Sequence, residues 1–399
     1  LERGVTNLTL NRLKMVDVSR CALRHFPHIL CTLTHLEFLD MGHNALSSLP
    51  SCMAKLQKLR VLFFLGNAFE TIPSVLHELG ALETLSFKGN RLTHLGEDTL
   101  PVSVRALILT DNQLTCLPAT IGHLHNLQKL MLSRNRITVL PPEIARCRKL
   151  ELIRLANNQL HALPDALYDL PNLAWIALGA NPMIPPAPAV RDELKMAMSD
   201  LTLGSIIGRG ASGTVYRAIL RTTSRNDSAV LRKSQEVAVK IYHNASAISD
   251  GIPLDEVGVA AHISAVVHPR MQRLLGVVFA PHLAAVYEFA GPGTAQLGHP
   301  PSLDSVTRAT YTYENTNRTA SLTLHVVGRV AANVASAIAG MHAYNVIHGD
   351  IYPHNILFNA STGWATLLDF GASFLVPPSL PPPPHTRTLP TTMGTPYDS

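Results

Sequence analysis

The first half of the chain repeats one arrangement of apolar and polar positions. Asparagines recur every 23 residues, with a single interval of 22. Around each of them the order approaches Leu-x-x-Leu-x-Leu-x-x-Asn-x-Leu-x-x-Leu-Pro, which predicts a short strand at Leu-x-Leu and a turn of looser helix after Leu-Pro. The asparagines are Asn44, Asn67, Asn90, Asn112, Asn135, Asn158 and Asn181, and Cys21 holds the same position one repeat earlier.

This period and pattern resemble the leucine-rich repeat, so residues 1–181 are expected to form an α/β solenoid. One unit cannot bury its own apolar face, and stacked units therefore share a continuous core. Each asparagine amide is expected inside the turn after its strand, where it satisfies buried backbone groups. Residues 95–98 read Leu-Gly-Glu-Asp in place of Leu-Pro, which favours a local change of curvature, and the array is expected to begin in mid-repeat.

Side chains alternate along a strand, so the residues between the strand leucines are expected on the concave surface. This set is Phe38, Asp40, Val61, Phe63, Leu65, Thr84, Ser86, Lys88, Lys129, Met131, Arg134 and Trp175. The apolar members of the first two repeats, Phe38 to Leu65, could form a patch that binds a protein partner. They could equally pack against one another, and the sequence leaves both interpretations open.

The pattern changes after Asn181. Prolines between residues 182 and 188 predict a semi-rigid linker, and residues 191–199 could form a short helix, so residues 182–200 are assigned to a linker. A helix is expected from about Leu254 to His268, with strands at 274–278 and 285–290. The polar run 311–320 is expected to be an exposed insertion. Residues 322–344 are expected to form a core helix through Ala331, Val334, Ala335, Ile338 and Met341.

Four motifs in this half occur in the order found in protein kinases. They are Gly-Arg-Gly-Ala-Ser-Gly-Thr-Val at 208–215, Val-Ala-Val-Lys at 237–240, His-Gly-Asp-Ile-Tyr-Pro-His-Asn at 348–355 and Asp-Phe-Gly at 369–371. A glycine turn alone could belong to a dinucleotide-binding fold, but that fold needs a helix where this sequence has a second strand. Residues 201–399 therefore resemble the protein kinase family.

The resemblance implies an α+β two-lobed domain with an N-lobe at about 201–290 and an incomplete, truncated C-lobe at about 291–399. It implies ATP and Mg²⁺ or Mn²⁺ as cofactors. The catalytic residues would be Asp350, Lys240 and Asn355, with Asn355 and Asp369 as metal ligands. Residues around ATP would be Ile207, Gly208, Gly210, Gly213, Val215, Ala238, Lys240, Glu256, Glu288, Ala290 and Leu357.

Individual roles follow from the same resemblance. Asp350 would accept or orient the proton of the attacking hydroxyl, and Lys240 would hold the α- and β-phosphates. Glu256 is the expected partner of Lys240, with Asp255 as the second choice. Tyr287 would be the gatekeeper beside the adenine site.

The catalytic loop departs from the usual kinase pattern. Gly349 stands where most eukaryotic kinases have arginine, and Tyr352 stands where Ser/Thr kinases have lysine, with His354 just before the asparagine. This variant resembles a subset of soluble leucine-rich-repeat kinases. His348 is expected to pack with Phe370 in a hydrophobic spine rather than to transfer protons.

Composition bears on the class of partner and on the cellular location. The net charge of +5 is spread along the chain without a basic block, so no nucleic-acid partner is expected. Five cysteines lie in the first half at spacings that suggest neither a zinc site nor paired bridges, which favours a reducing compartment. No signal peptide or uninterrupted apolar run of membrane-spanning length is found, so a cytoplasmic protein without a membrane span is expected.

Two functions from different classes remain. The first is an ATP-dependent Ser/Thr protein kinase whose repeats bind a protein partner on the concave face. The second is a non-catalytic scaffold with a pseudokinase-like remnant, suggested by the missing C-lobe helices and by the loss of lysine near Asp350. The complete set of motifs favours the kinase.

Overall fold

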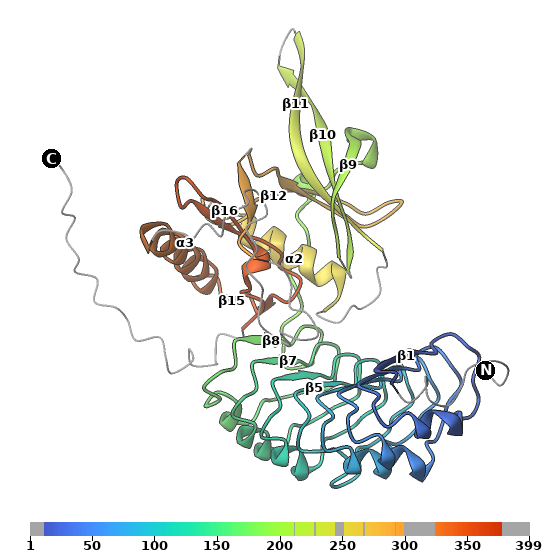
Figure 1. Ribbon diagram of the computed structural model, residues 1–399. Coiled ribbons are helices and arrows are strands. Elements are labelled where there is room, and N and C mark those ends of the chain that lie inside the picture. Colours follow the sequence, from blue (N-terminus) through green and yellow to red (C-terminus); the bar gives the residue numbers. More distant parts are fainter. Residues whose placement is uncertain are drawn as a thin grey trace.

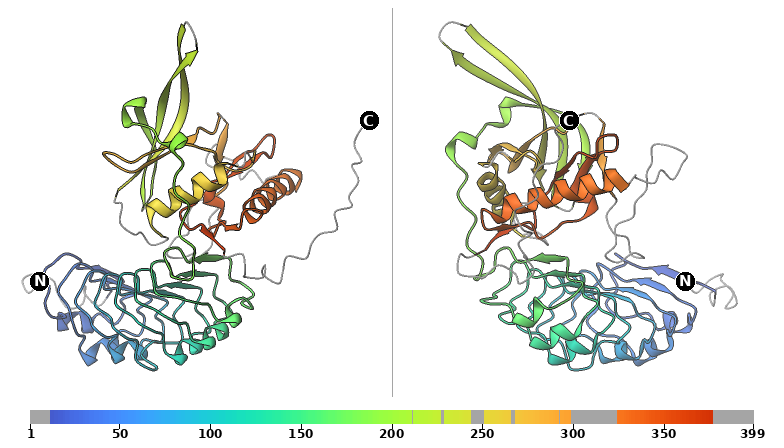
Figure 2. Two further views of the ribbon diagram at one scale, coloured as in Figure 1. Left: turned by 180° about the vertical axis from the view of Figure 1, so that it is seen from behind. Right: turned by 90° about the vertical axis from the view of Figure 1, so that its left-hand side faces the viewer.

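The computed structural model describes residues 12–210, 212–226, 229–243, 251–265, 268–291, 293–298 and 324–376. The expected insertion at 311–320 and the tail from 377 lie outside the described residues. The repeats form an arc, and the second half of the chain rests on the end of the arc that carries β7 and β8 (Figures 1 and 2).

Eight three-residue strands of the array form one parallel sheet in sequence order. They are β1 (Met15–Asp17), β2 (Phe38–Asp40), β3 (Val61–Phe63), β4 (Thr84–Ser86), β5 (Ala106–Ile108), β6 (Lys129–Met131), β7 (Leu152–Arg154) and β8 (Trp175–Ala177). The central residue of most strands points into the leucine core, and Leu39, Leu62 and Leu85 are fully buried. The flanking residues face the concave side because side chains alternate along a strand.

Turns of 3-10 helix follow most of the strands, as the Leu-Pro positions predict. They are η1 (His28–Thr32), η2 (Ser51–Lys55), η3 (Ser74–Glu78), η4 (Ala119–His123), η5 (Pro142–Arg146) and η6 (Asp165–Leu167). Between β4 and β5, a segment that is described throughout, no such turn forms and Asp98 has a φ of 49°. This is the repeat whose sequence lacks Leu-Pro.

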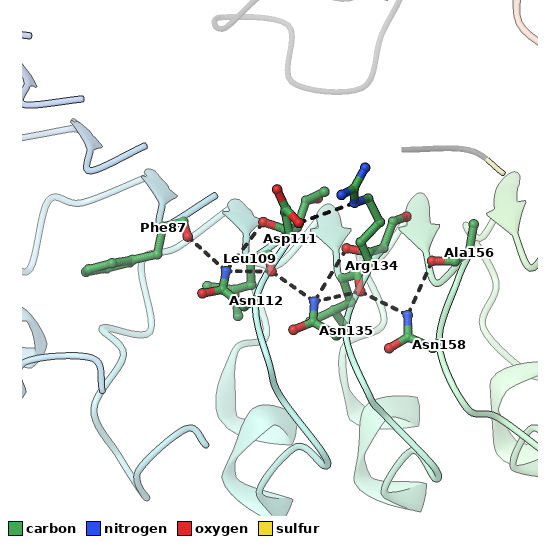
Figure 3. A network of polar contacts seen from close by, with 11 residues as sticks. Phe87, Leu109, Asp111, Asn112, Arg134, Asn135, Ala156 and Asn158 are labelled. Carbon is green, nitrogen blue, oxygen red and sulfur yellow. Dashed lines mark hydrogen bonds and ion pairs between the residues drawn. The ribbon is translucent and has the colours of Figure 1, made fainter. Parts of the chain in front are cut away.

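The asparagine side chains join neighbouring repeats through backbone hydrogen bonds (Figure 3). The Asn135 amide oxygen accepts from the Leu114 N–H at 3.0 Å. Its amide nitrogen donates to the carbonyls of Leu109 at 3.0 Å and Leu132 at 2.8 Å. The predicted structural role of the asparagines is confirmed, because each amide satisfies backbone groups of two successive repeats.

The cysteine prediction is wrong at one place. Cys31 and Cys52 form a disulfide, with 5.7 Å between their Cα atoms. Stacking of the repeats brings η1 and η2 side by side, so two residues 21 positions apart in the sequence become neighbours. Cysteine usage therefore gives no argument for a reducing compartment.

The second half begins with a five-stranded antiparallel sheet in the order β12-β13-β11-β10-β9. Its strands are β9 (Leu201–Arg209), β10 (Gly213–Asn226), β11 (Ala229–Tyr242), β12 (Leu274–Val278) and β13 (Ala284–Glu288), and helix α2 (Pro253–Ser264) packs near it. Further elements are α3 (Leu324–His342), η9 (Pro353–Asn355), a sheet of β14 (Thr294–Gln296), β16 (Ile356–Asn359) and β17 (Ala365–Leu367), and a pair of β15 (Val346–Ile347) and β18 (Phe374–Leu375). Sheet and helices agree with the predicted kinase-like arrangement.

The linker contains two short turns in place of the predicted helix. These are η7 (Asp192–Leu194) and η8 (Met198–Asp200). The segment is pinned to the sheet, because the Met196 N–H donates to the Val277 carbonyl at 2.9 Å. That backbone pairing competes with helix formation in a segment too short to be a stable helix.

Helix α3 buries part of the predicted face. Met341 is buried and the half-buried Val334 and Ile338 pack against the core, as predicted, whereas Ala331 and Ala335 are exposed. The other buried residues of α3 are Val326, Val330 and Ala337. In the described part of the chain, α3 is long and apolar enough to cross a membrane by length and composition, and 17% of that stretch is buried. The absence of a membrane span therefore stays a prediction.

Candidate active site

The glycine-rich turn joins β9 to β10. The Gly210 N–H donates to the Gly213 carbonyl at 2.9 Å and closes the turn. A Cβ on Gly213 would lie 2.5 Å from the Ile241 carbonyl oxygen, so only glycine fits beside β11. Gly208 pairs with Val215 across the two strands, and Ile207 just before it is half exposed. The turn is therefore held close to the strand that carries Lys240.

Lys240 lies between two carboxylates that come from distant parts of the sequence. Its Nζ is 2.6 Å from Glu256 Oε1 on α2 and 3.3 Å from Asp369 Oδ1. Lys240 and Glu256 are buried, while the Asp369 side chain is about half exposed. Glu256, the expected partner, is thus the residue that α2 brings to Lys240, and the second choice, Asp255, stands one position earlier on the helix.

Lys240 and Asp369 stabilise each other's charged forms. Burial acts to lower the pKa of Lys240, but the carboxylates of Asp369 and Glu256 outweigh it and raise that pKa above its ordinary value. Burial acts to raise the pKa of Asp369, yet the Lys240 ammonium and the Gly371 backbone N–H hold it below its ordinary value. Lys240 and Asp369 are therefore both charged at neutral pH.

The catalytic loop is fixed by hydrogen bonds to the strand before Asp369. The Asn355 amide nitrogen donates to the Asp350 carbonyl at 3.1 Å, and the Leu368 N–H donates to the Asn355 carbonyl at 2.8 Å. These contacts bring the loop carrying Asp350 and Asn355 next to the metal-binding motif. Asp350 and Asn355 are therefore hydrogen-bonded to each other and to the residue before Asp369.

His348 is part of the hydrophobic interior, as predicted. Its ring centroid is 5.6 Å from that of Phe370. Nδ1 accepts from the Asp350 N–H at 3.3 Å, so Nε2 carries the proton and donates to the Leu368 carbonyl at 3.0 Å. Burial lowers the pKa of His348 to about 4, which keeps the ring neutral.

The residues expected around adenine lie on neighbouring strands. Ala238 and the half-buried Val215 belong to one apolar cluster. Ala238 pairs with the buried Tyr287, and Val237 pairs with Glu288. The Glu288 N–H donates to the Arg273 carbonyl at 2.9 Å, so this group is already used within the protein. Two further expected contacts, Ala290 after β13 and Leu357 on β16, are half buried.

Asn355 and Asp369 offer oxygen ligands of the kind that Mg²⁺ prefers. The Asn355 amide nitrogen is committed to the Asp350 carbonyl, which leaves the amide oxygen for a cation. The Asp369 carboxylate is charged and partly open to solvent. This donor set fits a divalent metal ion.

No pattern in the sequence indicates that the array reaches the catalytic loop. Trp175 of β8 forms an isolated backbone bridge with Asp350, and its ring centroid is 5.0 Å from that of Tyr352. Arg154 of β7 stacks on Trp175, with its guanidinium carbon 4.4 Å from the ring centroid. Trp175 was predicted on the concave surface, but only the fold places the catalytic loop against it.

Comparison with known proteins agrees with this architecture. Residues 201–397 match the protein kinase domain family, and residues 80–137 and 125–183 match the leucine rich repeat family. The chain is 30% identical over 209 residues to the leaf rust 10 disease-resistance locus receptor-like protein kinase-like 1.1 of Arabidopsis thaliana, an overlap of 51% of this chain and 28% of that protein.

Relatives from other organisms are matched over a similar length. Serine/threonine-protein kinase PkaA of Streptomyces coelicolor is 30% identical over 172 residues, 42% of this chain and 29% of that protein. Aurora/IPL1-related protein kinase 2 of Caenorhabditis briggsae is 25% identical over 187 residues, 46% of this chain and 52% of that protein. The chain thus spans only part of the length of each relative.

Proposed function

Because this chain belongs to the leucine-rich-repeat protein kinases, we propose that it transfers the γ-phosphate of ATP to a protein hydroxyl, with serine or threonine as the acceptor. The observation that carries the proposal is the placement of Lys240, whose Nζ contacts both Glu256 and Asp369. These three groups come from a strand, a helix and a loop, and phosphoryl transfer depends mainly on such positioning and on charge neutralisation.

The residues of the site take separate parts in this reaction. Lys240 binds phosphate oxygens of ATP, and its ion pair with Glu256 keeps the ammonium in place. Asp350 accepts or orients the proton of the incoming hydroxyl. Asn355 and Asp369 would hold a magnesium or manganese ion, which would supply neutralisation of the phosphate charge. His348 stays neutral and supports the loop.

The scaffold alternative is less well supported than the kinase. A protein that no longer catalyses phosphotransfer has no need of a buried lysine between two carboxylates. Burial of charged groups is costly, so keeping this cluster favours the kinase.

The protein partner is proposed on the concave surface of the first repeats. There the rings of Phe38 and Phe63 lie 5.6 Å apart and remain half buried, so they pack together and still present apolar surface. A cytoplasmic location stays part of the proposal.

Replacement of Lys240 or Asp369 tests the proposed phosphotransfer. Lys240→Met and Asp369→Ala in the full-length protein are each expected to lower phosphotransfer to a generic protein substrate by at least about a hundredfold, since each removes a contact to the transferring phosphates. The measurement is incorporation of labelled phosphate from ATP. Lys58→Met, which changes an exposed lysine of the array, serves as the matched control. Undiminished transfer in either site variant would refute the kinase assignment.

A further inference from the structure

The catalytic loop lies against the concave surface of the last two repeats. The backbone of Trp175 pairs with that of Asp350, the residue proposed to orient the hydroxyl. The Trp175 ring packs on Tyr352 in a cluster with Leu152, and the half-buried Met131 borders it. Tyr352 is only 8% exposed. The position that is lysine in Ser/Thr kinases is therefore used here for packing against the array.

Gly349 lies next to this contact, at a position that only glycine fits. Its φ is 76°, a conformation that favours glycine. A Cβ at this position would lie 2.4 Å from the Ala372 carbonyl oxygen and 2.8 Å from the Ile176 carbonyl oxygen of β8. The residue that is arginine in most kinases thus sits in a gap between the array and the segment after Asp-Phe-Gly. No larger side chain fits while β8 stays where it is.

A positive charge of the array reaches the same loop. Arg154 is held by its stacking on Trp175, with its guanidinium carbon 4.4 Å from the ring centroid. The guanidinium is thereby held beside the ring that packs on Tyr352 of the catalytic loop. Two repeats therefore supply an aromatic ring and a guanidinium beside a loop that has lost both of its own usual cations.

We propose that Trp175 and Arg154 are positioning residues for phosphotransfer, so that the repeat array forms part of the catalytic apparatus. Trp175 fixes the loop through Tyr352 and the Asp350 backbone, and Arg154 braces Trp175 and brings positive charge to the loop. The Lys240–Glu256 pair is formed while the array is docked, so docking is compatible with an assembled nucleotide site. If the array instead blocked Asp350, loss of the contact between the array and the loop would raise the rate of phosphotransfer.

Kinetics of full-length variants test this positioning, and this readout rests on the proposed kinase function. Trp175→Ala is expected to lower kcat at least about tenfold while the KM for ATP changes less than about twofold, because a loop displaced by about 1 Å loses alignment without losing the nucleotide site. Trp175→Phe keeps a ring and is expected to retain most of the rate. Arg154→Gln is expected to lower kcat, and Arg154→Lys to restore part of it.

Matched controls lie on the same array. Tyr168→Ala removes an exposed ring that follows η6, outside both the concave patch and the catalytic-loop contact, and Arg91→Gln removes an exposed arginine. Both are expected to leave kcat unchanged. An unchanged or raised kcat in both Trp175→Ala and Arg154→Gln would overturn the proposal, and a raised value would identify the array as an inhibitor.

A second readout does not need phosphotransfer. Amide hydrogen exchange of residues 348–355 is expected to speed up in Trp175→Ala and Arg154→Gln, but not in the two controls. If exchange is faster in the two variants but the wild-type protein transfers no phosphate to any substrate, only the proposed function is refuted. Unchanged exchange in both variants would refute the positioning itself, whatever the activity.

Discussion

His348 illustrates how burial decides the chemistry of a single residue. Its imidazole accepts from the Asp350 N–H and donates to the Leu368 carbonyl, so both nitrogens are used by the neutral ring. A proton on Nδ1 would break the first contact and place a charge in an apolar environment. The sequence could suggest this role through the kinase resemblance, but the protonation state follows only from the contacts.

A pH-dependent stability follows for His348. Its pKa is about 4 in the folded state and about 6.5 when unfolded, so the unfolded chain binds more protons between these values. The free energy of unfolding therefore decreases as the pH is lowered through this window. The stability is fully present above pH 6.5. From pH 7 to pH 5 the loss due to this residue is about 2 kcal/mol.

Urea unfolding of the wild type and of His348→Gln at pH 7 and pH 5 measures the contribution of His348 to this loss of stability. Glutamine does not titrate, so the stability difference between the two proteins should shrink by about 2 kcal/mol at the lower pH. A difference that is equal at pH 7 and pH 5 would show that His348 is not held neutral by burial.

At the scale of elements, the asparagine ladder carries a clear energetic prediction. Asn135→Ala would leave the Leu114 N–H without its side-chain partner inside the array. The Leu109 and Leu132 carbonyls would each lose one of two side-chain donors and keep those of Asn112 and Asn158. A buried group left unsatisfied costs about 1–3 kcal/mol, so we expect a loss of about 2 kcal/mol in the free energy of unfolding. Asn172→Ala, which removes one exposed hydrogen bond to the Arg148 carbonyl, should cost less than about 1 kcal/mol. Comparable losses in the two variants in urea unfolding would contradict the ladder's role.

Elements with a strong period were predictable from the sequence. The repeats and the asparagine ladder follow from a spacing of 23, because each unit must meet the same neighbour in the same way. Helix α3 was predictable, and so was the part of its core face formed by Val334, Ile338 and Met341. The limits of that face were not, since the exposed Ala331 and Ala335 are as apolar as residues that are buried. Periodicity marks an apolar helix but not which of its apolar sides the neighbouring strands cover.

The candidate site also contains contacts that the sequence predicts and contacts that it does not. The kinase motifs placed Lys240 and Glu256 together because their order along the chain reflects a known fold. The disulfide of Cys31 and the contact of Trp175 with the catalytic loop depend instead on how segments stack in space. No local pattern records a contact between two parts that are separated by well over a hundred residues, as Trp175 and Tyr352 are.

At the scale of the whole molecule, the array and the second half share a hydrophobic core. Phe374 of β18 is 5% exposed and belongs to the leucine core of the array, together with the half-buried Ile347 and Val376. β18 also pairs with β15 just before the catalytic loop. The strand that follows Asp-Phe-Gly therefore ties the repeats to the active site.

This shared core predicts that the two halves unfold together. Phe374→Ala should cost about 3–5 kcal/mol and separate one thermal transition into two, because it empties the contact between the halves. The matched control is Phe358→Ala, a buried phenylalanine of the kinase core alone, which should destabilise the second half without affecting the junction. Calorimetry of the wild type and both variants measures this. If Phe374→Ala still unfolds in one transition with an unchanged midpoint, the halves are not coupled through β18, and the array could hold the catalytic loop only through Trp175 and its neighbours.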